Sequence, residues 1–534
     1  MARLTRRQAL RLGLLGAAPF LAPAAIRRLL GGSSALAGSA GSHHSRYRSL
    51  VDAPASPAVT PFQVQLPVPS VLDQSASFMP ACELDPAWGT PTFHEVTMRT
   101  ATVEIIPGLG TEVYGYNGLY PGPTIRARKG SPVVVRFHND LDVETVVHNH
   151  GGHQAGKFEG NTLADSDSFP SDLIFPGSSK DYCYPSISPE NDVSEFASTQ
   201  WYHDHAMDVT GEHVYRGLAG FYLLTDELEE GLVASGKLPG PAFDIPVVIQ
   251  DKLFSASGEL VYDTFDFDGF LGDRFVINGK VQPFFKVERK KYRFRFLNGS
   301  NARFYELELS SGSFLQIGTD TWLFPQAIPQ QTLRIAPAQR ADVIVDFRNA
   351  PSEVFLSNIL VQESGRGPKE VKRPGTPLIK FLVQSGTPVD NATIAPGQAL
   401  RPHTVIRADE IVQTRRFEFE RRHGAWQVNH QFFDPNRDDA TPKLGTAERW
   451  ILKNGGGGWW HPIHIHDEAH QIQRINGKPP PLVDSYKKDT TTLGPGDEIE
   501  VFMKFRTFPG RFAFHCHNIE HEDMRMMAVF NVIP

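Results

Sequence analysis

Residues near the C-terminus combine the donor atoms of two metal sites. His515-Cys516-His517 is followed by His521 and Met526. Neighbouring side chains of an extended strand point to opposite faces, so Cys516 should face away from both of its histidine neighbours. A thiolate, an imidazole and a weak thioether, spaced C-x4-H-x4-M, are three of the four donors of a blue-copper electron-transfer site. This segment therefore predicts a redox metal beside Cys516 and a second metal site behind it.

A nearby segment can supply the missing imidazole. Residues 461–466 read HPIHIH. His464 and His466 share one face of a strand by the period of two, whereas His461 is three residues from His464 and should point elsewhere. We expect His461 to complete the Cys516 site, and the other two histidines to join the pair that flanks Cys516.

Two more histidine pairs lie far upstream, His148 with His150 and His203 with His205. A single H-x-H pattern is usually accidental, but four imidazole motifs with thiolate and thioether donors around the last are not. Imidazole is a common copper ligand, so eight imidazoles predict more than one copper ion. The predicted set is His148, His150, His203, His205, His464, His466, His515 and His517.

In their order and intervals, these motifs resemble the ligand set of three-domain multicopper oxidases. The sequence is most similar to the bilirubin oxidase and bacterial laccase branch in WYHDHAM (201–207), YRGLAGFYLLTD (215–226), WWHPIHIH (459–466) and HCHNIEHEDMRMM (515–527). The resemblance implies four copper ions: one type 1, one type 2 and two type 3. It assigns His461, Cys516, His521 and Met526 to type 1, His148 and His464 to type 2, and His150, His203, His205, His466, His515 and His517 to type 3. Met524 and Met527 are rival axial ligands by proximity, but the spacing favours Met526.

The elements that position these residues are predicted to be strands. A chain of 534 residues suits about three domains, and 41 prolines with 46 glycines suit many short strands joined by turns. A weak repeat of turn and strand ends at Asn139, at Asn298 and near Asn454. We therefore predict an all-β protein of three cupredoxin-like Greek-key β-sandwich domains, at 61–226, 243–385 and 402–534. The middle domain has no copper motif and is expected to be a spacer, with the eight histidines between the first and third domains.

The N-terminal residues are predicted to direct export. Residues 1–37 contain Arg6-Arg7 and a short apolar run at 12–21, as in a twin-arginine signal, and the run is too short to span a bilayer. Residues 38–60 are expected to be a flexible lead-in, and no later stretch predicts a membrane span. We expect a periplasmic, cell-surface or secreted protein, in which Cys82 and Cys183 can form a disulfide.

The charge of the chain bounds its partners. Its formal net charge of −7 becomes more negative once the arginine-rich signal is removed, which argues against nucleic acid as a partner. Nothing in the sequence indicates an oligomeric state.

The resemblance also implies an activity. The type 1 copper would oxidise organic reductants such as bilirubin, phenols or aromatic amines by single electrons, and the three other coppers would reduce O2 to water. Proton donors are then needed, and Glu522 and Glu159 are the candidates, although relatives usually have Asp at the latter position. Trp459, two residues before His461, is a candidate for lining the reductant site or assisting electron entry.

Three other functions fit the sequence less well. A metal-ion oxidase acting on Cu(I) usually has a Met-rich segment, which this chain lacks, whereas Asp467 and Glu468 near the type 1 motif keep Fe(II) oxidation open. A non-enzymatic scaffold of this family would have lost copper ligands, and here each ligand position is filled. A two-domain nitrite reductase is disfavoured by the length of the chain and by the eight histidines.

Overall fold

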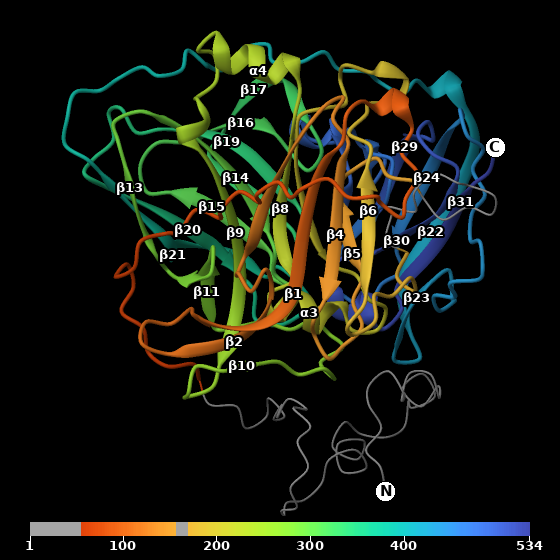
Figure 1. Cartoon of the computed structure of the whole chain (residues 1–534), viewed down its shortest axis with the longest axis horizontal. Helices are drawn as coiled ribbons and strands as arrows, with labels where there is room; N and C mark the ends of the chain where they lie inside the picture. The colour runs from red at the N-terminus through yellow and green to blue at the C-terminus, as the bar shows by residue number, and fades with distance from the viewer. Residues whose placement is uncertain (1–54, 156–168) are drawn as a thin grey trace, which may run out of the picture.

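The structure, a computed structural model, describes residues 55–155 and 169–534, and within them the chain folds mainly into strands. These strands form six sheets, which group in sequence order into a first, a middle and a third sheet pair. In Figure 1 the first pair is orange to yellow, the middle pair is green and the third pair is blue. The predicted all-β fold is confirmed.

The first sheet pair contains two four-stranded sheets, ordered β2-β1-β4-β6 and β3-β8-β7-β5. Alternating apolar side chains from both sheets, such as Val135, Phe137 and Tyr202, form one core. The strands are β1 (Thr92–Glu104), β2 (Gly110–Tyr116), β3 (Gly122–Arg128), β4 (Val133–Asn139), β5 (Val147–His150), β6 (Ser179–Tyr184), β7 (Ser198–Asp204) and β8 (Ala219–Thr225).

The middle sheet pair is the largest, with an eight-stranded and a five-stranded sheet around a core rich in phenylalanine. The orders are β12-β11-β9-β14-β19-β16-β17, with β10 beside β9, and β13-β21-β20-β15-β18. The strands are β9 (Asp244–Phe254), β10 (Leu260–Val261), β11 (Arg274–Ile277), β12 (Lys280–Val281), β13 (Phe284–Val287), β14 (Lys291–Asn298), β15 (Tyr305–Leu309), β16 (Phe314–Gly318), β17 (Leu323–Gln330), β18 (Thr332–Ile335), β19 (Arg340–Asp346), β20 (Glu353–Val361) and β21 (Glu370–Val383).

The third sheet pair has the orders β23-β22-β24-β29-β26-β27 and β28-β25-β30-β31. Its core contains Cys516 as well as large aromatic side chains. The strands are β22 (Ile411–Arg422), β23 (Ala425–Val428), β24 (Ala447–Asn454), β25 (His461–Ile465), β26 (His470–Ile475), β27 (Lys487–Lys488), β28 (Thr490–Leu493), β29 (Glu498–Lys504), β30 (Gly510–Cys516) and β31 (Met527–Val532).

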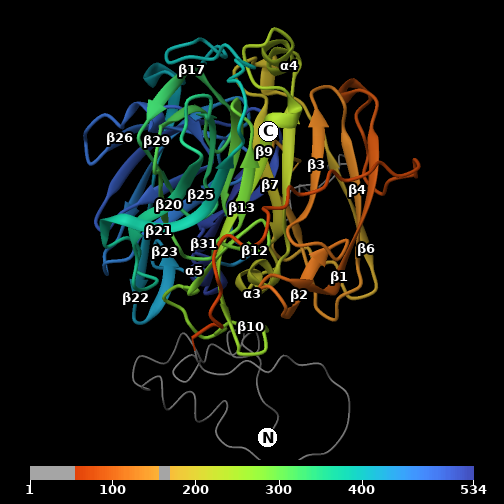
Figure 2. The ribbon, with the colours of Figure 1, turned by 90° about the vertical axis from the view of Figure 1, so that its left-hand side faces the viewer.

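Short helices occupy the connections between strands. Figure 2 shows α3 and α5 close together near the lower ends of the sheets, where the backbone N–H of Gly211 donates to the Asp523 carboxylate. The α-helices are α3 (Thr210–Arg216), α4 (Glu227–Ala234) and α5 (Ile519–Asp523), and the 3-10 helices are η2 (Pro86–Trp88), η3 (Pro189–Asn191), η4 (Pro241–Phe243), η5 (Ala408–Glu410) and η6 (Leu482–Asp484). Among the described residues, no helix is long and apolar enough to cross a membrane.

The weak sequence repeat corresponds to equivalent strands of the three pairs. Strands β4, β14 and β24 each lie beside one parallel and one antiparallel neighbour. Each ends in a buried asparagine, Asn139, Asn298 or Asn454, whose side-chain amide donates to carbonyls of the following loop and of a more distant segment. The same residue type recurs because a short amide side chain can satisfy two carbonyls where the chain leaves the sheet.

The described start of the chain lies against the middle sheet pair. Ser56, inside the predicted lead-in, is buried and donates its backbone N–H to Asp273, and the Leu66 N–H donates to the Phe284 carbonyl. Residues 55–66 are therefore held by strands far along the sequence. The twin-arginine segment and the rest of the lead-in fall outside the described residues. The three domain limits stay predictions from the sequence. The sheet pairs that the structure shows span residues 92–225, 244–383 and 411–532.

A disulfide joins Cys82 to Cys183 on β6, with 6.3 Å between the two Cα atoms. It closes a loop of 101 residues that includes most of the first sheet pair. Such a bond lowers the entropy of the unfolded chain.

Removing this disulfide should therefore destabilise the protein. We expect a Cys82→Ala, Cys183→Ala double variant to lose about 2–5 kcal/mol of unfolding free energy, seen as a lower melting temperature of the first thermal transition. Chemical reduction of the parent protein should give the same shift. Equal melting temperatures of the variant and the oxidised parent would contradict the expectation.

Candidate metal centres

The first centre forms around Cys516 at the end of β30. Its Sγ lies 3.5 Å from Nδ1 of His461, the first residue of β25, and 3.6 Å from Nδ1 of His521 on α5. The two imidazole Nδ1 atoms are 3.2 Å apart, and all three side chains are buried. The structure thus brings the predicted thiolate and both predicted imidazoles to one point.

The nearby methionines separate into two groups. Met524 and Met526 pack in the same apolar cluster as Cys516, and the Cys516 N–H donates to the Met526 carbonyl over 3.1 Å. Met527 packs instead in a separate cluster with Phe169 and Val529. The alternation along β31 therefore places Met527 away from Cys516 and leaves the predicted Met526, together with its rival Met524, on the Cys516 side.

Aromatic rings enclose this centre. The Trp426 ring centroid is 3.8 Å from that of His521 and 5.2 Å from that of Trp459. The guanidinium groups of Arg366 and Arg421 lie 4.4 and 4.9 Å from the Trp459 ring centroid. Trp459 is thus buried beside the centre, as its position in the sequence indicated. Sequence reasoning missed Trp426, because it lies 35 residues before His461 and belongs to no motif.

The second centre forms where the first and third sheet pairs meet. Strands β5 and β7 place His148 opposite His203, and β25 and β30 place His464 opposite His515. Across the interface, the Nε2 atoms of His148 and His464 are 3.3 Å apart. These histidines come from both ends of the sequence, as predicted.

The eight histidines divide into a pair and two trios. In each trio, one nitrogen from every ring lies within 4.8 Å of the others. The groups are His148 with His464, His150 with His203 and His517, and His205 with His466 and His515. This division matches the type 2 and type 3 sets that the resemblance implies, although His150 also lies within the same range of His148 and His464.

Burial sets the protonation of these donors. Loss of water lowers the pKa of eight of these imidazoles, to about 3 for His203 and His461, so these eight rings are neutral and can offer a lone pair to a metal. They are His148, His150, His203, His205, His461, His464, His517 and His521. Burial raises the pKa of the Cys516 thiol well above its usual range. Among the described buried atoms, Nε2 of His203 and both ring nitrogens of His517 have no hydrogen-bond partner. Buried neutral imidazoles with unused nitrogens, together with a thiol, fit copper ions.

Backbone carbonyls orient several rings. Nδ1 of His203 lies 2.8 Å from the Asp204 carbonyl, and Nδ1 of His464 lies 3.0 Å from the Asp489 carbonyl. Donation from Nδ1 fixes the tautomer and leaves the Nε2 lone pair for a metal. Asp489 was also missed from the sequence, because no motif links it to the histidines.

Of the two predicted proton donors, the structure describes one. The carboxylate oxygens of Glu522 lie 3.2 Å from Nδ1 of His205 and 3.1 Å from Nδ1 of His515. Burial raises the pKa of Glu522 despite the neighbouring His205. Glu159 falls in the segment 156–168, outside the described residues.

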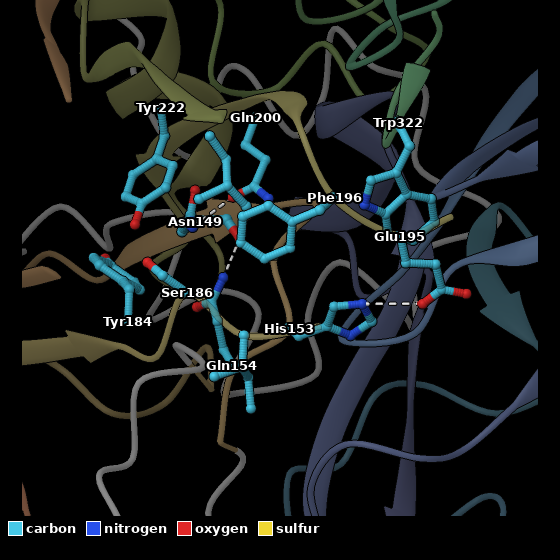
Figure 3. A pocket seen from close by; sticks show the side chains of 13 residues that line it. Asn149, His153, Gln154, Tyr184, Ser186, Glu195, Phe196, Gln200, Tyr222 and Trp322 are labelled. Carbon is cyan, nitrogen blue, oxygen red and sulfur yellow. Dashed lines mark hydrogen bonds and ion pairs between the residues drawn. The ribbon is translucent and has the colours of Figure 1, made fainter. Parts of the chain in front are cut away.

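A cavity of about 20 Å³ lies beside the residues that follow His150 (Figure 3), with room for about one water molecule. His153 and Glu195 border it, with 3.4 Å between Nε2 and the carboxylate.

Glu468 lies near the same histidine. Its carboxylate is 3.9 Å from Nδ1 of His153, and its side chain is 1% exposed. It accepts the backbone N–H groups of Arg506 and Thr507. Glu468 is thus buried with Oε1 bonded, and it forms a group with His153 and Glu195 whose ligand atoms lie within 4.8 Å of one another. Asp467 accepts the Gln154 N–H. Oxidation of Fe(II) stays an untested alternative.

Comparisons with known proteins agree with this geometry. Residues 97–229 and 403–534 each match a family described as multicopper oxidase. The bilirubin oxidase of Albifimbria verrucaria is 34% identical over 90% of this chain and 83% of its own length. A laccase of Bacillus subtilis is 30% identical over 83% and 94%. A solved laccase structure from Pediococcus acidilactici has a TM-score of 0.76 at 28% identity, covering 90% and 95%.

Three cupredoxin-like sheet pairs, with buried thiol and imidazole donors at these places, define a copper oxidase. The chain belongs to the multicopper oxidase family. It is an oxidoreductase that uses O2 as electron acceptor.

Replacing the thiol tests the first centre. We expect Cys516→Ser to abolish the blue absorption and lower oxidase activity at least about 100-fold, because a hydroxyl does not replace a thiolate as a copper donor. Visible absorption and the copper-to-protein ratio are measured. The Cys82→Ala, Cys183→Ala variant is the control and should stay blue. A blue Cys516→Ser protein would exclude this centre.

Proposed function

We propose that the chain holds four copper ions and couples oxidation of an organic reductant to reduction of O2. The type 1 ligands would be His461, Cys516, His521 and Met526, the type 2 ligands His148 and His464, and the type 3 ligands the two histidine trios. Copper bound by these residues would supply one-electron oxidation of a reductant and, with four protons, four-electron reduction of O2 to water. The residues of the chain hold the donors, connect the centres and supply protons.

One observation carries this proposal. Cys516 contacts His461 and His521, while its neighbours His515 and His517 each belong to one histidine trio. One peptide unit therefore joins Cys516 to His515, in one trio, and another joins it to His517, in the other trio. In addition, Nδ1 of His515 lies 3.2 Å from the Cys516 carbonyl, which gives a second contact between the centres. Electrons received near Cys516 have a short covalent route to the site of O2 reduction.

An aromatic reductant fits the surroundings of the first centre. Trp426 and Trp459 present aromatic rings beside His521 and His461, and the exposed Arg366 stacks over Trp459. Both rings are buried, so contact with a reductant falls to the exposed Arg366, whose guanidinium favours an anionic molecule and can stack on an aromatic one. Bilirubin has carboxylates that a guanidinium can bind. Phenols and aromatic amines have an aromatic ring on which it can stack.

A surface depression of about 510 Å³ lies beside β23, at the outer end of the third sheet pair. Its lining includes Gln427, which follows Trp426, and Arg525, which precedes Met526, together with Phe432 and Phe433. This volume is in the range of sites that bind small organic molecules. Phe433 packs with Met527 on the face away from Cys516, so Fe(II) or Cu(I) stays the second candidate class of reductant.

We also propose that Glu522 supplies protons to the histidine trios. One of its carboxylate oxygens lies against His205 and the other against His515, two members of the same trio. Its raised pKa favours a carboxyl group that holds a proton until the cluster needs one.

We propose that the protein is exported through the twin-arginine route and is located in the periplasm, at the cell surface or in the medium. The Arg6-Arg7 segment supports it, and the disulfide between Cys82 and Cys183 suits an oxidising compartment.

Oxygen uptake by the copper-loaded protein tests the reductant. Bilirubin, a methoxyphenol, Fe(II) and Cu(I) are compared at equal concentration. We expect the organic compounds to be consumed at least about 10-fold faster than the metal ions, because aromatic rings and arginines surround the first centre. Faster oxidation of a metal ion would make the protein a metal oxidase, and no uptake with any reductant would contradict the proposed function.

A charge-neutral substitution tests the proton donor. Glu522→Gln should slow O2 reduction about 10–100-fold and leave the blue absorption unchanged, because the amide cannot deliver a proton. Stopped-flow reoxidation of the reduced protein by O2 measures this step apart from oxidation of the reductant. Glu498→Gln, on a partly exposed ion pair with Arg416, is the control. Unchanged reoxidation in Glu522→Gln would remove the proposed role.

A further inference from the structure

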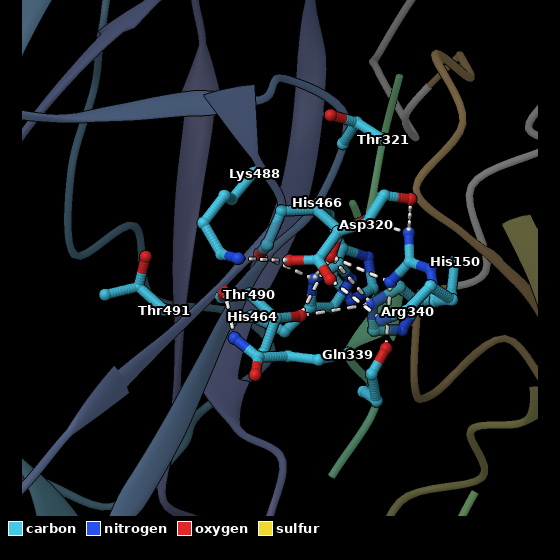
Figure 4. Close-up of polar contacts among 12 residues, drawn as sticks. His150, Asp320, Thr321, Gln339, Arg340, His464, His466, Lys488, Thr490 and Thr491 are labelled. Carbon is cyan, nitrogen blue, oxygen red and sulfur yellow. Dashed lines mark hydrogen bonds and ion pairs between the residues drawn. The ribbon is translucent and has the colours of Figure 1, made fainter. Parts of the chain in front are cut away.

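The middle sheet pair, expected to be only a spacer, sends one charged side chain to the histidines. Arg340 is the first residue of β19, and its guanidinium is completely buried. Figure 4 shows it beside His150. A buried guanidinium is costly unless its N–H groups all find acceptors.

Each of the five N–H groups of Arg340 can be matched to an acceptor. Nε donates to the Thr199 carbonyl on β7 over 2.8 Å, and Nη1 donates to the Ala338 carbonyl over 2.9 Å. Nη2 donates to the Asp320 carbonyl, and both Nη atoms bind the Asp489 carboxylate. These acceptors belong to all three sheet pairs or their loops. One cation therefore ties the three together at the histidine cluster.

Asp489 passes this constraint to two candidate copper ligands. Its carboxylate oxygen Oδ1 lies 3.2 Å from Nε2 of His150, and its carbonyl lies 3.0 Å from Nδ1 of His464. Thr490 donates its hydroxyl to the same carboxylate oxygen over 2.8 Å. The residue thus touches one ring from the first sheet pair and one from the third. A carboxylate that orients a ligand histidine typically changes metal affinity 10–100-fold.

The backbone leaves room for this contact. Gly151 follows His150 with a φ of +95°, and a Cβ there would lie 2.6 Å from Oδ2 of Asp489 and 2.7 Å from Nη2 of Arg340. Any side chain at this position would meet the ion pair. The glycine therefore lets the Arg340–Asp489 pair lie directly against the backbone of a candidate copper ligand.

The pair is also held from behind. Asp320 is buried and accepts the Arg340 backbone N–H over 2.9 Å. Lys488 lies 3.7 Å from the Asp320 carboxylate and donates to the Thr319 hydroxyl over 3.1 Å. Acid and base alternate here, so each buried charge of the group has an opposite neighbour.

We propose that Arg340 is a positioning residue for the histidine cluster, which it serves by fixing Asp489 against His150 and His464. The inference rests on the copper ligands proposed above. It gives the middle sheet pair a role in copper retention, in addition to spacing the other two pairs.

The test compares copper retention in Arg340→Gln and Asp489→Asn with the parent holoprotein. During dialysis against a chelator, we expect both variants to lose the type 2 electron paramagnetic resonance signal about 10-fold faster than the parent. The blue absorption of the Cys516 centre should persist, because its donors make no contact with this pair. Asp489→Asn keeps the size of the side chain, so it carries the test if Arg340→Gln does not fold.

Arg401→Gln is the matched control, since Arg401 is also completely buried and pairs with Asp226 over 2.7 Å. It should keep the parent's type 2 signal, and Arg340→Lys should recover only part of the retention because an ammonium cannot bind the carboxylate with two nitrogens. The proposal is overturned if both signals decay together, if Arg401→Gln behaves like Arg340→Gln, or if Asp489→Asn retains the type 2 signal like the parent. A parent protein that shows no type 2 signal when copper-loaded would instead contradict the proposed ligands.

Discussion

The alternation of side chains about Cys516 is the constraint on which the rest of the structure depends. A strand sends neighbouring residues to opposite faces, so the thiol enters the core of the third sheet pair while His515 and His517 enter the interface with the first pair. A shift of β30 by one residue would exchange these faces and separate both centres. The pairing of β30 with β25 and β31 fixes the register over Phe514 to Cys516 and over Gly510 to His515.

Burial without partners is the second condition for these sites. Burial lowers the pKa of rings such as His203 and His517, so these rings are neutral, and their Nε2 atoms have no hydrogen bond among the described residues. Packing of the first and third sheet pairs holds these imidazoles together, although their unbonded nitrogens do not stabilise one another. A metal ion would satisfy them, and its binding free energy would add to the stability of the interface.

The three sheet pairs have equivalent strands but differ in the functional residues on them. Strands β4, β14 and β24 occupy equivalent places and end in equivalent asparagines, yet the middle pair has none of the histidine motifs. It contributes Arg340 instead, a cation whose acceptors lie in all three pairs. Removing one partner of such a buried ion pair typically costs about 3–5 kcal/mol, since the other charge stays buried.

The sequence by itself determined the all-β class, the repeated strand and the donor set, because these follow from residue types at short, regular spacings. His461, Cys516 and His521 meet as the period of the strands predicts, and Cys82 pairs with Cys183. Tertiary structure alone decided which distant groups surround the donors. Trp426, Arg340 and Asp489 lie against the candidate ligands through sheet packing, and Glu468 turns away to His153, since contacts between separate strands leave no pattern along the chain.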